Sequence, residues 1–174
     1  MTGSALQHRD AALSVDVLIE AQGWRTLPEA GDIVRRAIAC AAAVALEDPG
    51  GPRKQGLCVL LGDDEKIARL NGQWRGQDKP TNVLAFPAPA ACGGAPDETL
   101  GDIVIAYETL AREARENGQT VSDHLSHLVV HGFLHLLGYD HHMDDDAERM
   151  ERLERDILAR MGVDDPYAAY DADI

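Results

Sequence analysis

The sequence predicts a small α+β or α/β domain in which one sheet is covered by helices. Four short segments have the apolar or alternating pattern of strands, and about five longer segments repeat apolar residues at helical spacing. The two kinds of segment do not alternate strictly along the chain. With 174 residues the chain has the length of one domain, so we expect a single domain over residues 1–174.

The predicted strands are recognised in different ways. The first alternates apolar and polar residues from Ser14 to Glu20, as a half-buried strand does. The others are short runs rich in Val, Ile and Leu that are bounded by turn residues or, for the third, ended by Pro87. The four predicted strands cover residues 14–20, 56–61, 83–86 and 100–107.

The predicted helices carry ordinary start and stop signals. Pro28 suits a first helical turn, and a breaker that begins at Pro49 ends the first apolar repeat. Gly118 and Gly138 are typical of residues that end a helix. The last pattern is amphipathic, as in a packing helix. The predicted helices cover residues 28–48, 63–70, 107–117, 122–137 and 144–161. We expect a flexible loop over 87–98 and a frayed acidic tail over 163–174.

Composition indicates a cytoplasmic protein. The three cysteines, Cys40, Cys58 and Cys92, form no CxxC pair, and an odd count argues against a disulfide framework. No apolar run is long enough to span a membrane, and the first residues lack the pattern of an export signal. The net charge of −14 disfavours binding to nucleic acid. Residues 53–79, however, carry six basic and four acidic side chains, a net charge of +2.

Three histidines predict a metal centre. His131 and His135 are four residues apart, so on a helix they lie on one face, one turn apart. A continuing helix would point His141 away from them. Gly138 removes this obstacle, because glycine can adopt the left-handed conformation that ends a helix and turns the chain back. Three neutral imidazoles would leave a tetrahedral zinc ion one open position for water, as in catalytic sites.

The neighbouring polar residues each have two possible roles. His124 and His127 fall on the same helical face as the pair. His127 is a candidate for orienting a ligand or touching substrate, and an ordinary polar rim residue is the alternative. Asp140 is a candidate for holding a ligand imidazole or assisting the bound water, and stabilising the turn is its alternative. His142 is expected in solvent.

The spacing HxxxHxxGxxH also occurs in zinc peptidases, which is the first alternative function. In those enzymes the residue after the first histidine is a glutamate that acts as the general base. Here that position is Gly132. Without the carboxylate, peptide hydrolysis lacks its obvious proton acceptor.

A basic stretch from Leu70 to Pro87 gathers arginine, lysine and amide groups with one tryptophan. On a loop, Arg75 can present its planar fork to a phosphate and neutralise charge that grows during phosphoryl transfer. A solvated loop charge is the alternative. Lys79 is a second candidate for substrate binding, and Trp74 could stack on a base or simply pack.

On these stretches the sequence closely resembles the YbeY family of metal-dependent endoribonucleases, the rRNA maturation factors. The resemblance rests in order on LNGQWRGQDKPTNVLAFP at 70–87, GDIVI at 101–105 and HGFLHLLGYDH at 131–141. It implies an α+β fold with a central four-stranded mixed sheet and a zinc ion on His131, His135 and His141. It also places the functionally important arginine of the family at Arg75. One departure is Ala85, where the family often has serine.

The resemblance further implies a single-strand-specific endoribonuclease that acts in rRNA processing, including 16S 3′-end maturation, and in ribosome biogenesis. Ribosomal RNA and the small subunit are then the partners, with no DNA and no membrane. Either the 2′-hydroxyl of the RNA or an activated water could be the nucleophile. A non-catalytic ribosome-assembly factor is the second alternative function. Low basicity predicts weak binding to naked RNA.

Overall fold

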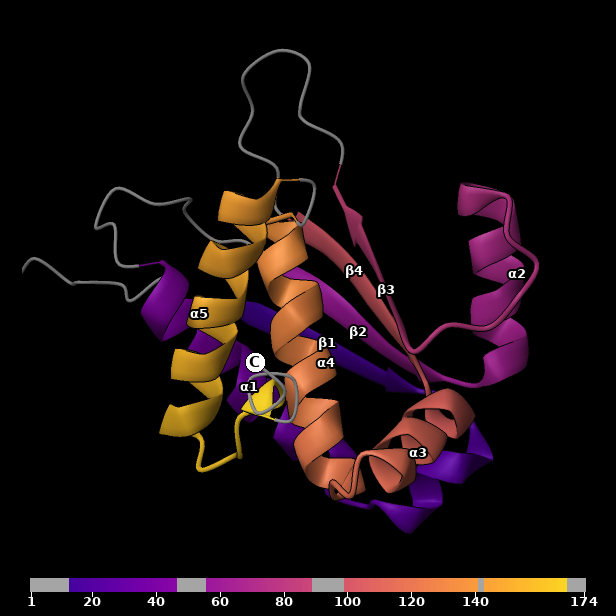
Figure 1. Cartoon of the computed structure of the whole chain (residues 1–174). Coiled ribbons are helices and arrows are strands. Elements are labelled where there is room, and N and C mark those ends of the chain that lie inside the picture. The colour runs from indigo at the N-terminus through magenta and orange to yellow at the C-terminus, as the bar shows by residue number, and fades with distance from the viewer. Residues whose placement is uncertain (1–12, 47–55, 89–98, 141–142, 169–174) are drawn as a thin grey trace, which may run out of the picture.

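A four-stranded mixed sheet forms the centre of the protein (Figure 1). The computed structural model describes residues 13–46, 56–88, 99–140 and 143–168. Strand β2 pairs in parallel with both β1 and β4, whereas β3 runs antiparallel to β4. The order is β1-β2-β4-β3, so β1 and β3 are the edge strands. The strands are β1 (Ser14–Ile19), β2 (Gly56–Gly62), β3 (Val83–Pro87) and β4 (Thr99–Ala106).

Helices cover both faces of the sheet unequally (Figure 1). Helices α1, α4 and α5 lie on one face, α2 lies on the other, and α3 lies at the end where β4 finishes. This arrangement confirms the predicted α+β fold with its four-stranded mixed sheet and five helices. The helices are α1 (Ala30–Ala45), α2 (Asp64–Arg75), α3 (Tyr107–Glu116), α4 (Val121–Leu136) and α5 (Asp144–Arg160).

Two local features differ from the sequence prediction. Helix α2 continues to Arg75 instead of ending near residue 70, and Gly76 ends it in the left-handed conformation with φ 68°. The buried amide of Asn71 donates to the carbonyl of Lys79 over 2.9 Å, which folds the following loop back onto the helix. A short 3-10 helix, η1 (Gln22–Thr26), was not predicted, and it buries Trp24.

Alternation along the strands divides the core into two parts. Val59 and Ile103, which are register partners, face α1, α4 and α5 in the main core. Leu84 and Val104 face the other way and pack with Ile67 of α2 in a smaller cluster. Helix α4 is buried on most of its surface because it lies between the sheet and α5 (Figure 1). Its first turn is capped by Thr120, whose side chain accepts from the N–H of Asp123 over 3.0 Å.

Several predicted features lie partly outside the described residues. The predicted flexible loop is described only at residues 87 and 88. Residues 163–168 of the predicted frayed tail lie against α5, where Val163 is buried, whereas 169–174 are outside the described part. Cys40 and Cys58 are free thiols, and Cys92 is outside. Among the described residues, no helix combines the length and apolarity needed to cross a bilayer.

Candidate metal centre

The last two turns of α4 bring His131 and His135 together at the surface of the protein. Both side chains are half-buried, and their ring centroids are 4.6 Å apart. The two Nε2 atoms face each other at 3.1 Å. The predicted i, i+4 pairing on one helical face is therefore present.

The hydrogen bonds of the other ring nitrogens fix which atoms carry protons. Nδ1 of His131 lies 2.6 Å from a carboxylate oxygen of Glu154, and Nδ1 of His135 lies 2.9 Å from the carbonyl oxygen of Tyr139. A carbonyl and an ionised carboxylate only accept, so both Nδ1 atoms donate. In the neutral rings, each Nε2 then carries a lone pair directed at the other.

This arrangement fits a shared metal ion. Two lone pairs 3.1 Å apart repel each other unless a proton or a cation lies between them. Two imidazoles on one tetrahedral zinc ion, with bonds of about 2.0–2.1 Å, have nitrogens about 3.3 Å apart. The observed separation is close to that value, so the pair could serve as two ligands of one ion.

A glycine turn follows the helix, as the sequence predicts. Gly138 has φ 91°. Its N–H donates a hydrogen bond to the carbonyl of His135 over 3.0 Å, and the N–H of Tyr139 donates to the carbonyl of Leu134 over 3.1 Å. These are the two bonds of a Schellman motif. The turn also supplies the Tyr139 carbonyl that holds His135. His141 and His142 lie outside the described residues, so the third predicted ligand keeps its status as a prediction.

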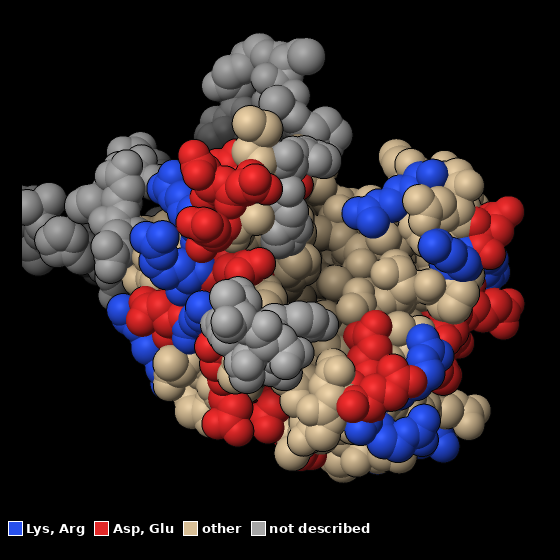
Figure 2. All heavy atoms as spheres, in the orientation of Figure 1, with Lys and Arg blue, Asp and Glu red and all other residues tan. Residues whose placement is uncertain are grey.

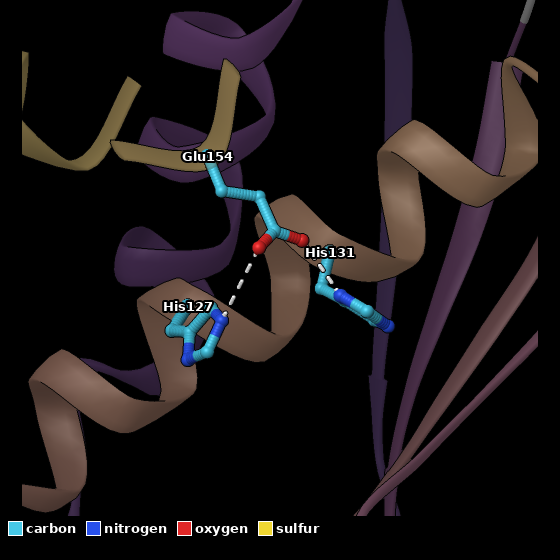
Figure 3. Close-up of side chains that lie close together, drawn as sticks. All are labelled: His127, His131 and Glu154. Carbon is cyan, nitrogen blue, oxygen red and sulfur yellow. Dashed lines mark hydrogen bonds and ion pairs between the residues drawn. The ribbon is translucent and has the colours of Figure 1, made fainter. Parts of the chain in front are cut away.

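A buried carboxylate on α5 joins this centre, and sequence reasoning missed it. Glu154 is 0% exposed and lies between His127 and His131 (Figure 3). The three side chains form a group that could hold a metal ion. Burial alone would raise the pKa of Glu154, but contacts with His127 and His131 hold it well below its usual range. The available signal was a glutamate at helical spacing with Met150, Ile157 and Leu158, inside an apolar stripe.

His127 therefore faces α5, where its Nε2 lies 3.6 Å from Oε2 of Glu154. His124 is buried one turn earlier, and its Nε2 lies 2.8 Å from Glu113 of α3. Glu113 also accepts from the amide of Asn82, just before β3, over 3.0 Å. Burial alone would raise the pKa of Glu113, but hydrogen bonds from His124 and Asn82 lower it below its ordinary value. This second group links α4 to the segment that precedes β3.

A cleft of about 660 Å³ opens between α4 and β3, and His131 and His135 line one wall. Arg75 lines it from the end of α2, together with Asn82 just before β3 and Asp140 beyond the glycine turn. Figure 2 shows this hollow with an uncharged floor, and blue side chains at the upper end of α2 border it. The cleft thus contains a cation as well as the histidine pair.

The basic stretch divides between helix and loop. Arg75 is the last residue of α2, not a loop residue as expected, and it is exposed. Lys79 is exposed in the loop that follows. Trp74 is 71% exposed, with its ring centroid 5.8 Å from that of Phe86. Of the two basic side chains in this stretch, Arg75 lines the cleft that contains the histidine pair, whereas Lys79 does not.

Gly132 lies where α4 packs against β4 of the sheet. A Cβ atom built there would be 3.0 Å from Cγ2 of Ile103 on β4. Such a contact is tighter than ordinary packing allows without a shift of the neighbour. Gly132 lines the cleft without a side chain, so the position that carries the general base in the zinc peptidases supplies no carboxylate here.

Comparisons with known proteins agree with this description. The family model described as Endoribonuclease YbeY matches residues 27–162. A protein of Rhodopseudomonas palustris strain BisB18 named Endoribonuclease YbeY is 53% identical over 161 residues, which cover 91% of this chain and 94% of that protein. One of Nitrobacter winogradskyi with the same name is 51% identical over 164 residues, 92% of this chain and 85% of the relative.

A solved structure is similar in fold. The solution structure of a Thermotoga maritima protein matches with a TM-score of 0.54 and 24% sequence identity, and the match covers 91% of this chain and 93% of that one. At this identity the likeness concerns the fold alone. It supports the same arrangement of sheet and helices.

Proposed function

Because this chain belongs to the YbeY family of endoribonucleases, we propose that it is a single-strand-specific, metal-dependent endoribonuclease. It acts in the cytoplasm on ribosomal RNA, including the 3′ end of 16S rRNA, and serves ribosome biogenesis with the small subunit as its partner. The observation that carries the proposal is the facing Nε2 pair of His131 and His135 in a cleft that also contains Arg75.

His131, His135 and His141 hold one zinc ion in this proposal. Neutral imidazole nitrogens suit zinc, and they also accept other divalent transition metals. The alternative set of His127, His131 and Glu154 would use Nδ1 of His131, which already donates to Glu154 over 2.6 Å. We therefore place the ion on the Nε2 side. When bound, it supplies a Lewis acid that polarises a phosphate oxygen and lowers the pKa of a water.

Arg75 binds the scissile phosphate in the cleft that it shares with the histidine pair. Its guanidinium offers two parallel N–H groups to two phosphate oxygens. Negative charge on these oxygens grows as the phosphodiester bond breaks, so a fixed cation lowers the barrier. A lysine at this position would provide the charge without the bidentate geometry.

The shape and charge of the protein support a single-stranded substrate delivered by a larger assembly. The cleft has the volume of a small-molecule site, which admits an unstacked strand with splayed bases. The first turn of α5 carries Asp144, Asp145 and Asp146, and Figure 2 shows the red patch at that end of α5. This negative charge disfavours the binding of RNA that is free of the ribosome. We expect feeble cleavage of free oligonucleotides and dependence on the ribosome to present the strand.

The experiment that tests the proposal separates metal binding from cleavage. Metal content and cleavage of single-stranded RNA are measured for the wild type, His135→Ala and Arg75→Ala, with Arg69→Ala as the matched control. Arg69 is an exposed α2 arginine paired with Glu65 at 3.8 Å. We expect His135→Ala to lose the metal and cleavage. Arg75→Ala should keep the metal and cleave about 10²–10³-fold more slowly, as when one transition-state donor is removed.

Other outcomes would contradict the proposal. Equal cleavage by the wild type and both site variants would identify a contaminating nuclease. If His135→Ala still supports rRNA processing in cells, the protein is an assembly factor that uses the ion as a clamp. The ends of the products distinguish the nucleophiles, because attack by the 2′-hydroxyl leaves a cyclic phosphate and attack by water does not.

A further inference from the structure

Glu154 is a buried carboxylate whose two oxygens have different partners. Oε1 accepts from Nδ1 of His131 over 2.6 Å. Oε2 accepts from the hydroxyl of Tyr167, and Nε2 of His127 lies 3.6 Å from it. In Figure 3 the carboxylate points between the two rings, and the other nitrogen of His131 points away from it. Glu154 thus fixes His131 with Nδ1 protonated and Nε2 directed at His135.

The hydroxyl of Tyr167 comes from the short segment after α5, residues 163–168, which contacts α5 and also packs the Tyr167 ring against the ring of His127, with centroids 5.7 Å apart. The N–H of Val163 bonds the carbonyl of Leu158 over 3.0 Å. Nε of Arg155 lies 3.4 Å from Asp165, and its guanidinium carbon lies 5.3 Å from the centre of the Tyr167 ring. Contacts with α5 therefore fix the position of Tyr167 beside Glu154.

Stability alone does not account for a charge at this position. A buried carboxylate pays a large desolvation penalty, and apolar residues of similar volume often replace buried ionic groups without loss of stability. Carboxylates that accept the second N–H of a ligating histidine are, in contrast, a known means of orienting the ring and raising its basicity. Tyr167 retains its proton as a donor, because burial and the charge of Glu154 raise its pKa.

We infer that Glu154 and Tyr167 are positioning residues of the metal centre, and that the segment 163–168 is a working part of the site through them. Glu154 holds His131 in the ligating tautomer, and Tyr167 holds Glu154. This inference rests on the proposed function, since it takes Nε2 of His131 as a metal ligand. It differs from a site in which Glu154 itself binds the ion.

The test measures zinc affinity by competition with a chromophoric chelator, on the full chain. The variants are Glu154→Gln and Tyr167→Phe, and each has a matched control. Glu148→Gln changes an exposed glutamate of α5, and Tyr107→Phe removes a hydroxyl that bonds Thr26 at 2.6 Å. We expect Glu154→Gln to weaken zinc binding by about 10–100-fold and Tyr167→Phe by a smaller factor, with both controls unchanged.

A spectroscopic readout separates positioning from a merely structural role. In the zinc-loaded wild type, the Nδ1 proton of His131 should give a downfield NMR resonance, because it is donated to a carboxylate. Glu154→Gln should move this resonance upfield, and Tyr167→Phe should shift it less. Circular dichroism and thermal unfolding of the metal-free variants check that the fold is retained.

The outcomes distinguish the possible failures. Unchanged zinc affinity and an unchanged Nδ1 resonance in both variants, with affinity still lost in His135→Ala, would overturn this inference alone. If Glu154→Gln abolishes binding as completely as His135→Ala, Glu154 is a ligand and the inference is wrong. Wild-type zinc affinity no higher than that of His135→Ala would overturn the proposed function as well.

Discussion

His131 and His135 each donate one ring N–H to an acceptor outside the pair. Glu154 of α5 and the carbonyl of Tyr139 are these acceptors. The i, i+4 spacing was sufficient to predict the pair, because helix geometry puts both residues on one face. The spacing did not indicate which nitrogen of each ring is protonated. That choice follows from partners that are 23 and 4 residues away in the sequence.

A substitution of Glu113 tests the hydrogen-bonded group that Glu113 forms with His124 and Asn82. The pKa of Glu113 in the folded protein lies below its ordinary value, so the ionised carboxylate stabilises the fold. This contribution is fully present above the unfolded pKa of about 4.5. It is lost as the pH falls through the folded pKa. We expect Glu113→Gln to lower the free energy of unfolding by about 1–2 kcal/mol at pH 7.5. The deficit should shrink below about pH 4.5.

Urea unfolding at pH 7.5 and at pH 3.5 measures this difference. Glu116→Gln is the matched control, since Glu116 is an exposed glutamate of the same helix. A deficit for Glu113→Gln that stays constant between the two pH values would contradict the role given to its charge.

Helix α4 and the sheet define the site at the scale of elements. The amphipathic patterns predicted that α4 and β4 exist, and the structure shows that they touch at Gly132 and Ile103. The sequence places Gly132 within a predicted helix, but it does not show which strand packs against this glycine.

Substitution of this glycine tests the contact. The Cβ atom of Gly132→Glu would lie 3.0 Å from Cγ2 of Ile103 unless that side chain shifts, so we expect a loss of about 1–3 kcal/mol in the free energy of unfolding. Chemical denaturation measures the loss. Ala39→Glu places the same residue on an exposed position of α1 and should change stability by no more than about 0.5 kcal/mol. Equal stability of the two variants would rule out the tight helix–sheet contact.

Charge distribution governs RNA binding at the scale of the whole molecule. The net charge of −14 opposes a polyanion, and Arg75 and Lys79 are the proposed phosphate contacts. Two contacts to a single strand predict that log Kobs falls with log salt concentration at a slope of about −1.4. We expect Arg75→Ala to reduce the steepness by about 0.7, with Arg69→Ala unchanged. Fluorescence anisotropy of a labelled oligonucleotide between low and moderate salt measures both slopes. Equal slopes for the wild type and Arg75→Ala would remove Arg75 from the phosphate contacts.

Sequence alone determined what is local in this protein. Strand alternation, helical repeats and glycine turns depend on neighbouring residues, so the elements, the histidine pair and the turn at Gly138 could be predicted. Tertiary structure alone decided what depends on distant partners. The burial of Glu154 against His131, the contact of Tyr167 with it, and the position of Arg75 in the cleft join segments that only packing brings together. The role of a charged residue in an apolar stripe, such as Glu154, cannot be predicted until its partners are known. Desolvation and hydrogen bonding act through space and not along the chain.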